Sequence, residues 1–181
     1  MFGSAARWKR TRPDRLTRLA RAIDLLGERD QNLVDESARV DRLRIRGATE
    51  LHAICRAFTE ALNGRLSKPS VMLDPADYSA QRYSDTAPGL FQINLRGRLL
   101  QIRFQATEEP YSREDFRRPY VLHGAVRSFN QDFLDHNTVD EKAIFYCTEE
   151  EDGRWYYFDT RTYRTGQLTQ DFLVAELEQL L

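Results

Sequence analysis

Apolar residues at helical spacing mark the N-terminal part of the chain. They recur at every third or fourth position, which predicts one apolar stripe along a helix. We expect this helix to begin near Pro13, whose ring suits a first helical turn, and to end near Gly27. The residues of the stripe are Leu16, Leu19, Ile23 and Leu26.

The same stripe can be continued through Leu33 and Val40. The alternate heptad positions in this continuation, Asp30 and Ser37, are polar. They argue against a long coiled coil, although a short pair of helices is compatible with the pattern. For residues 40–46 two interpretations stay open, the end of a helix or a short strand.

The clearest helix is predicted between Thr49 and Leu62. Its apolar residues fall on one face, and Asn63-Gly64 supplies a left-handed stop at its end. A short apolar strand is expected at 71–73. Residues 74–88 then form a long polar loop, interpreted either as a binding loop or as a segment that contains a helical turn.

The middle of the chain predicts a β-hairpin whose register can be checked. Apolar and polar residues alternate on both sides of Arg96-Gly97. With those two residues as the turn, Ile93 pairs with Leu100 and Gln92 with Gln101. Apolar side chains then face apolar ones and amides face amides, which supports this register.

Further strands are expected at 120–129, 143–148 and 155–160. The last two flank Asp152-Gly153, which we interpret as the turn of a second hairpin. Both faces of this hairpin carry apolar residues, so it should be covered on both sides, on one of them by a helix. An amphipathic helix is predicted over 168–181, with Thr169 as its N-cap.

These elements define an α+β fold: N-terminal helices, a mostly antiparallel sheet of about six strands, and a C-terminal amphipathic helix packed on the sheet. We divide the chain into a basic arm and helical extension, 1–46, and an α+β domain, 47–181. The residues identify no known family.

Composition narrows the classes of protein that the chain can represent. Hydrophobic residues make up 41% of it, which argues against disorder, and charged residues 30%, which argues against a membrane protein. No secretory signal is apparent, so we expect a cytoplasmic protein whose two cysteines, Cys55 and Cys147, are reduced and buried.

The net charge of −1 hides a segregation of charge along the chain. Arginine and lysine dominate the first 21 residues, and acids dominate the segment from Asp132 to the end. Such ends could steer association with a second copy or a charged partner, or could simply be solvated. The arm contains Trp8 among cations, a composition that suits a phosphate backbone and is also common in flexible tails.

One face of the first hairpin is the best candidate for ligand binding. No acid occurs between Thr86 and Thr107, so amides and guanidinium groups predominate there. Such a platform can hold an anion, a nucleic-acid backbone or a peptide, and a plain solvated sheet face is the alternative. The candidate residues are Gln92, Asn94, Arg96, Gln101, Arg103, His123 and Arg127.

The sequence predicts no catalytic residue, no metal site and no cofactor, because no arrangement of His, Cys and acids has a defensible spacing. Three hypotheses remain. The first is a non-catalytic protein-binding module that dimerises through Leu16, Leu19, Ile23 and Leu26. The second is a binder of nucleic acid or an anionic ligand. The third is an enzyme with a site between the sheet and the 74–88 loop.

Overall fold

The structure is a computed structural model that describes residues 14–130, 139–149 and 152–181. It divides into two compact units, Met1–Ala38 and Arg39–Leu181. The sequence placed this boundary later, between 46 and 47. The N-terminal arm, including Pro13, lies outside the described residues.

One long helix, α1, spans Arg15–Asn63 and belongs to both units. Asp14 caps it, because its Oδ1 accepts a hydrogen bond of 2.7 Å from the backbone N–H of Thr17. The predicted end near Gly27 is wrong, since one glycine among good helix formers costs only about 1 kcal/mol. Residues 40–46, which the sequence left open, are helical.

In the part of the chain that the structure describes, seven strands form one sheet in which each strand pairs antiparallel with the next. The fold class is therefore confirmed, with seven strands instead of about six. The strands are β1 (Val71–Asp74), β2 (Gly89–Leu95), β3 (Arg98–Ala106), β4 (Tyr120–Asn130), β5 (Asp140–Glu149), β6 (Asp152–Asp159) and β7 (Arg164–Gln167). The strand that the sequence missed is β7, whose residues show no apolar alternation.

The predicted register of the first hairpin is confirmed. Ile93 pairs with Leu100, and Gln92 pairs with Gln101. Arg96 and Gly97 both have positive φ, 49° and 86°, as a two-residue hairpin turn requires. The 74–88 loop contains one turn of 3-10 helix, η1 (Ala80–Arg82), as one of the two interpretations expected.

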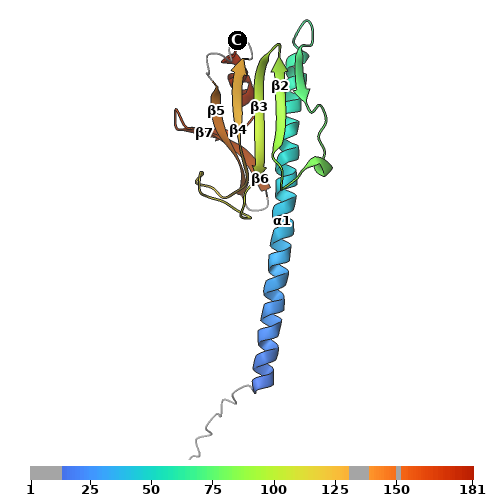
Figure 1. Cartoon of the computed structure of the whole chain (residues 1–181), viewed down its shortest axis with the longest axis vertical. Coiled ribbons are helices and arrows are strands. Elements are labelled where there is room, and N and C mark those ends of the chain that lie inside the picture. Colours follow the sequence, from blue (N-terminus) through green and yellow to red (C-terminus); the bar gives the residue numbers. More distant parts are fainter. Residues whose placement is uncertain (1–13, 131–138, 150–151) are drawn as a thin grey trace, which may run out of the picture. The chain divides into compact units, whose positions relative to one another are not determined.

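One face of the sheet carries the main core, and within the second unit it is covered by α1 from Val40 onward and by α2 (Gln170–Glu178) (Figure 1). Gly47 lets the helix approach closely, because a Cβ there would lie 2.7 Å from the ring of Tyr146. Trp155 Nε1 donates a 2.8 Å hydrogen bond to the carbonyl of Gly47 at the same place.

The opposite face of the sheet carries an apolar cluster over part of β4 to β6 and mixed polar and apolar residues elsewhere. A bulge between Tyr120 and Leu122 turns Tyr120 away from the core and toward this face. There Tyr120, Phe145 and Cys147 form a second apolar cluster, against which Phe116 of the 107–119 loop packs. The β5–β6 hairpin is thus covered on both sides, as its sequence indicated.

The predicted second hairpin is confirmed by the pairing of β5 with β6, but its turn does not lie at Asp152-Gly153. Both residues belong to β6, where Asp152 pairs with Glu149 and Gly153 pairs with Thr148. The glycine serves close packing, because a Cβ on Gly153 would lie 2.4 Å from the ring of Tyr146. The Asp-Gly pair is typical of a turn, but here the glycine is explained by its contact with Tyr146 of the neighbouring strand.

Candidate functional site

The first unit presents a continuous apolar surface. We define the exposed stripe as Leu16, Leu19, Ile23, Leu26 and Leu33, whose exposed fractions lie between 57% and 77%. They are spaced so that they share one side of α1. Every described residue before Glu36 is exposed, so this part of the helix buries none of its apolar side chains.

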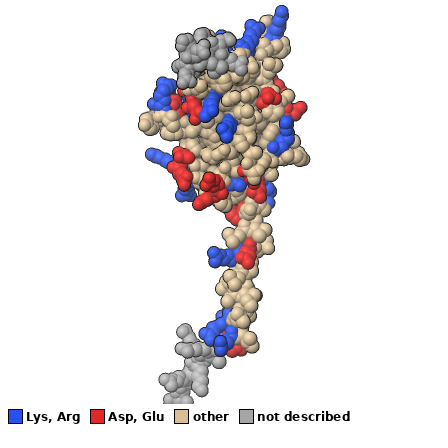
Figure 2. All heavy atoms as spheres, in the orientation of Figure 1, with Lys and Arg blue, Asp and Glu red and all other residues tan. Residues whose placement is uncertain are grey.

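Charge is unevenly distributed along the same part of α1. Arg15, Arg18 and Arg21 lie in its first two turns, and Figure 2 shows basic side chains gathered at the start of the helix. In the segment that follows, residues 22–38, the charged residues are mainly acids, among them Glu28, Asp30 and Asp35. The exposed stripe therefore has a basic first end and an acidic second end.

Three residues of the predicted polar face lie side by side across the sheet. Gln92, Gln101 and Arg127 lie in one row across β2, β3 and β4. The next strand continues that row with Glu141, which forms an ion pair with Arg127. An acid distant in sequence therefore offsets the cation that would hold an anion there.

Of the other predicted residues, Asn94 and Arg103 lie two positions from this row along β2 and β3, on the same side of the sheet. Arg103 is exposed and pairs with Leu90 and Ala125, so it has apolar neighbours. His123 Nε2 lies 3.1 Å from Gln105 Nε2. Two residues serve the turn: Arg96 lies within it, and Asn94 Oδ1 accepts a hydrogen bond from the Gly97 N–H.

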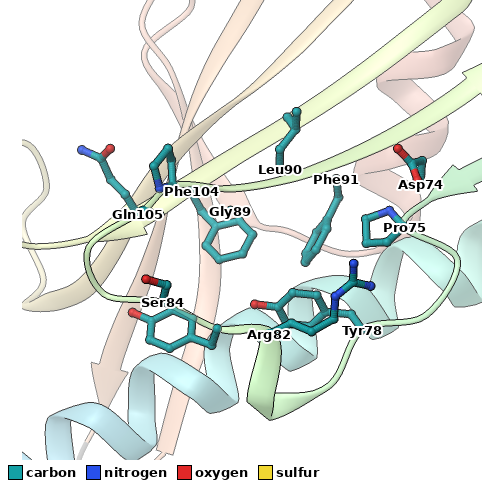
Figure 3. Close-up of a pocket in the computed structure, with 13 residues that line it drawn as sticks. Asp74, Pro75, Tyr78, Arg82, Ser84, Gly89, Leu90, Phe91, Phe104 and Gln105 are labelled. Carbon is teal, nitrogen blue, oxygen red and sulfur yellow. The ribbon is translucent and has the colours of Figure 1, made fainter.

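A hollow of about 300 Å³ lies between the 74–88 loop and the end of the β2–β3 hairpin. Figure 3 shows the rings of Phe91 and Phe104 directed into it from the sheet, with Tyr78 and Arg82 on the loop side. The hollow is therefore lined by aromatic rings and by one guanidinium group. Asp74, Tyr83 and Gln105 also line it.

Side-chain contacts hold the loop around this hollow. His52 Nε2 lies 2.9 Å from the carbonyl of Pro75, and its ring stacks on Tyr78. Tyr83 donates a 2.6 Å hydrogen bond to Asp85, whose Oδ1 also lies 3.6 Å from Nη1 of the buried Arg44. Burial, and then the hydrogen bond to Asp85, raise the pKa of Tyr83, so the phenol is kept neutral. Such a hydroxyl anchors the loop and is a poor base.

The two cysteines are free and buried, as predicted. Burial raises the pKa of each thiol to about 12, so the reactive thiolate is scarce at neutral pH. Within the described ranges, no three His, Cys, Asp or Glu side chains are grouped so that they could hold a metal ion.

A buried lysine in the second unit is paired with two acids. Lys142 Nζ lies 2.6 Å from Asp140 and 2.7 Å from Glu176 of α2. Burial lowers the pKa of Lys142, but its hydrogen bonds to Asp140 and Glu176 outweigh this effect and raise it. A lysine held charged between two acids ties α2 to β5 and offers no nucleophile.

Sequence reasoning identified the first four residues of the exposed stripe but not its extent. Leu33 was recognised only as a possible continuation, because Gly27 suggested that the helix ended. Sequence reasoning also missed that Arg44 is buried and forms hydrogen bonds, because its partners are distant in sequence and no local pattern indicates them.

No protein-family model, no curated protein and no solved structure matches this chain. Among the helices of the described residues, none is long and apolar enough to span a bilayer.

Proposed function

We propose that the protein is a non-catalytic interaction module that self-associates by pairing the first half of α1 with the same segment of a second copy. The observation that carries this proposal is the exposed stripe. Fully burying one leucine or isoleucine side chain is worth about 1.5–3 kcal/mol, so a complementary apolar surface would be bound favourably.

Helix stability supports the same proposal. An isolated helix shorter than about 15 residues is marginal in water, and longer ones usually depend on the packing of an apolar face. The described part of the first unit is all helix, and its apolar side chains are exposed. A second copy would supply the missing packing.

The charge pattern favours an antiparallel pair. In that orientation the arginine-rich beginning of one helix lies beside the acidic segment of the other. In one such register Leu16 faces Leu33 of the partner subunit and Ile23 faces Leu26 of the partner subunit, whereas Leu19 faces Asp30 of the partner subunit. A parallel pair would instead place the two Asp30 carboxylates opposite each other and align the two basic ends.

Two neighbouring leucines provide a test of self-association. Leu26 belongs to the exposed stripe, whereas Leu25 is similarly exposed but points to another side of the helix. Light scattering on the full chain should show a dimer that Leu26→Lys converts to a monomer and Leu25→Lys leaves intact. A wild-type chain that stays monomeric at about 100 µM, or equal effects of both changes, would contradict the proposal.

Disulfide trapping tests the orientation. An oxidised mixture of Leu16→Cys and Leu33→Cys chains should form the mixed dimer, and Leu16→Cys alone should not cross-link. Because the native thiols are buried, they contribute little background. Cross-linking of Leu16→Cys with itself would show a parallel pair and would leave self-association intact.

The alternative function, binding of nucleic acid or an anionic ligand, has weaker support. The arginines at the start of α1 favour it. The pairing of Arg127 with Glu141 argues against the sheet face as an anion platform. We therefore rank it second.

A further inference from the structure

Strand β7 forms an edge of the sheet and pairs, in the described part of the chain, only with β6. The opposite edge strand, β1, is capped at its start: Asn63 Nδ2 donates to the carbonyl of Val71, and Asn63 Oδ1 accepts from its N–H. Three of the four residues of β7, Arg164, Thr165 and Gln167, are exposed. An edge without a cap is a surface to which another strand can add.

The backbone groups that face outward from β7 follow from one hydrogen bond. The N–H of Leu168 donates to the carbonyl of Trp155 at 2.9 Å, so Leu168 turns its backbone toward β6. In an antiparallel ladder this orientation alternates, which directs Gly166 inward and Thr165 and Gln167 outward. Two donors and two acceptors are thus presented along the edge.

A hollow lies on each side of this edge. The outer hollow, of about 650 Å³, has aromatic walls formed by Phe116, Tyr156, Phe158 and Tyr163. The inner hollow, of about 510 Å³, lies between β7 and α2 and is more polar. Gly166 borders both. Because side chains of a strand point alternately to its two faces, an added strand would direct them into the two hollows in turn.

Tyr163 is the second indication of a binding function at this edge. It has a φ of 56° and an exposed fraction of 81%, with its ring centroid 6.3 Å from that of Phe158. The left-handed conformation costs a residue other than glycine about 1–2 kcal/mol. A glycine would suit this turn better, so folding alone does not account for an exposed tyrosine at the rim of the outer hollow.

The charges around β7 suggest which sequences would bind. Arg117 borders the outer hollow together with Asp115, and Arg161 and Arg164 border the inner one together with Asp159, Asp171 and Glu176. Two of these acids are engaged within the fold: Asp159 accepts hydrogen bonds from Thr162 and from the backbone N–H of Arg161, and Glu176 is paired with Lys142. None of the three arginines forms an ion pair with any residue that the structure describes. Acidic side chains next to the bound residue would therefore be favoured.

We propose that β7 accepts an extended segment of a partner protein as an added strand, with an aromatic side chain in the outer hollow and acidic residues on either side of it. A four-residue edge supplies few backbone hydrogen bonds, so the aromatic hollow must provide most of the selectivity. This proposal does not depend on self-association through α1.

Selection from random peptides of about 12 residues, displayed on phage and applied to the immobilised full chain, tests the proposal. We expect enriched sequences with an aromatic residue flanked by acids. A fluorescent synthetic copy of the best sequence should bind at least about tenfold more weakly to Tyr163→Gly and to Thr165→Pro.

Both changes are designed to spare the fold. Glycine relieves the left-handed position, and the Thr165 N–H that proline removes does not bond to β6. Unchanged urea midpoints would show this. Arg103→Glu on the distant polar face is the matched control and should bind the peptide as the wild type does. No enrichment over blank wells, or equal binding to all variants, would overturn the proposal.

Discussion

The two halves of α1 carry the same kind of apolar stripe in opposite surroundings. In the second half, Val40, Leu51 and Phe58 are buried against the sheet. In the first half, Leu19, Leu26 and Leu33 are exposed. The periodicity of apolar residues therefore predicts which side of a helix packs against another surface. It does not predict whether that surface belongs to the same chain. We interpret the first half as a surface for a second copy.

The largest contrast between the halves is expected from leucine truncation. Leu51→Ala should lower the free energy of unfolding by about 2–5 kcal/mol, because it leaves a cavity under a fully buried side chain. Leu26→Ala should change it by less than about 0.5 kcal/mol in dilute protein. Urea unfolding followed by tryptophan fluorescence measures both. A large loss from Leu26→Ala at a concentration where the chain is monomeric would show that the first half is packed within one copy.

Arginine gives the next largest contrast. Arg44 Nη2 donates to the carbonyl of Thr107 at 2.9 Å, and its Nε donates to the carbonyl of Val121 at 3.3 Å. Arg44→Met should cost about 2–3 kcal/mol, because buried carbonyls lose a charged donor. Arg18→Met, on the exposed half, should be nearly neutral in the same unfolding experiment. Equal effects would mean that the guanidinium of Arg44 is replaced by water at little cost.

The parts of the fold that the sequence predicted depend on local patterns. The β2–β3 register followed from alternation and a two-residue turn, and the C-terminal helix followed from its apolar spacing. Thr169 occupies the N-cap position as predicted, but its side chain makes no capping hydrogen bond. The errors arose where distant contacts override local signals. Gly153 signalled a turn but makes room for Tyr146, and Gly27 signalled a helix end where the helix continues.

The candidate sites follow the same rule. Leu16 to Leu26 could be identified because a stripe is a local pattern. The ion pair between Arg127 and Glu141 could not, since it depends on the pairing of β4 with β5. The hollows beside β7 are likewise built from the 107–119 loop, β6 and α2, and no single segment indicates them.

The smallest contrast, and the only one in which the two halves should respond with opposite signs, concerns the glycines of α1. A Cβ on Gly47 would meet Tyr146 at 2.7 Å and Leu122 at 2.9 Å, whereas nothing lies within 4 Å of one on Gly27. Gly47→Ala should therefore destabilise the protein by about 1–2 kcal/mol, since the crowding exceeds the gain in helix propensity.

Gly27→Ala should instead stabilise the helix by up to about 1 kcal/mol, because alanine has the higher helix propensity and no neighbour opposes it. Circular dichroism at 222 nm during urea unfolding reports on both variants, and amide exchange of residues 20–34 locates the gain. Destabilisation by Gly27→Ala would mean that a neighbour approaches this side of the helix closely. If that loss appeared only at concentrations where the chain is dimeric, the neighbour would be the second copy, and the partner helix would cross at Gly27.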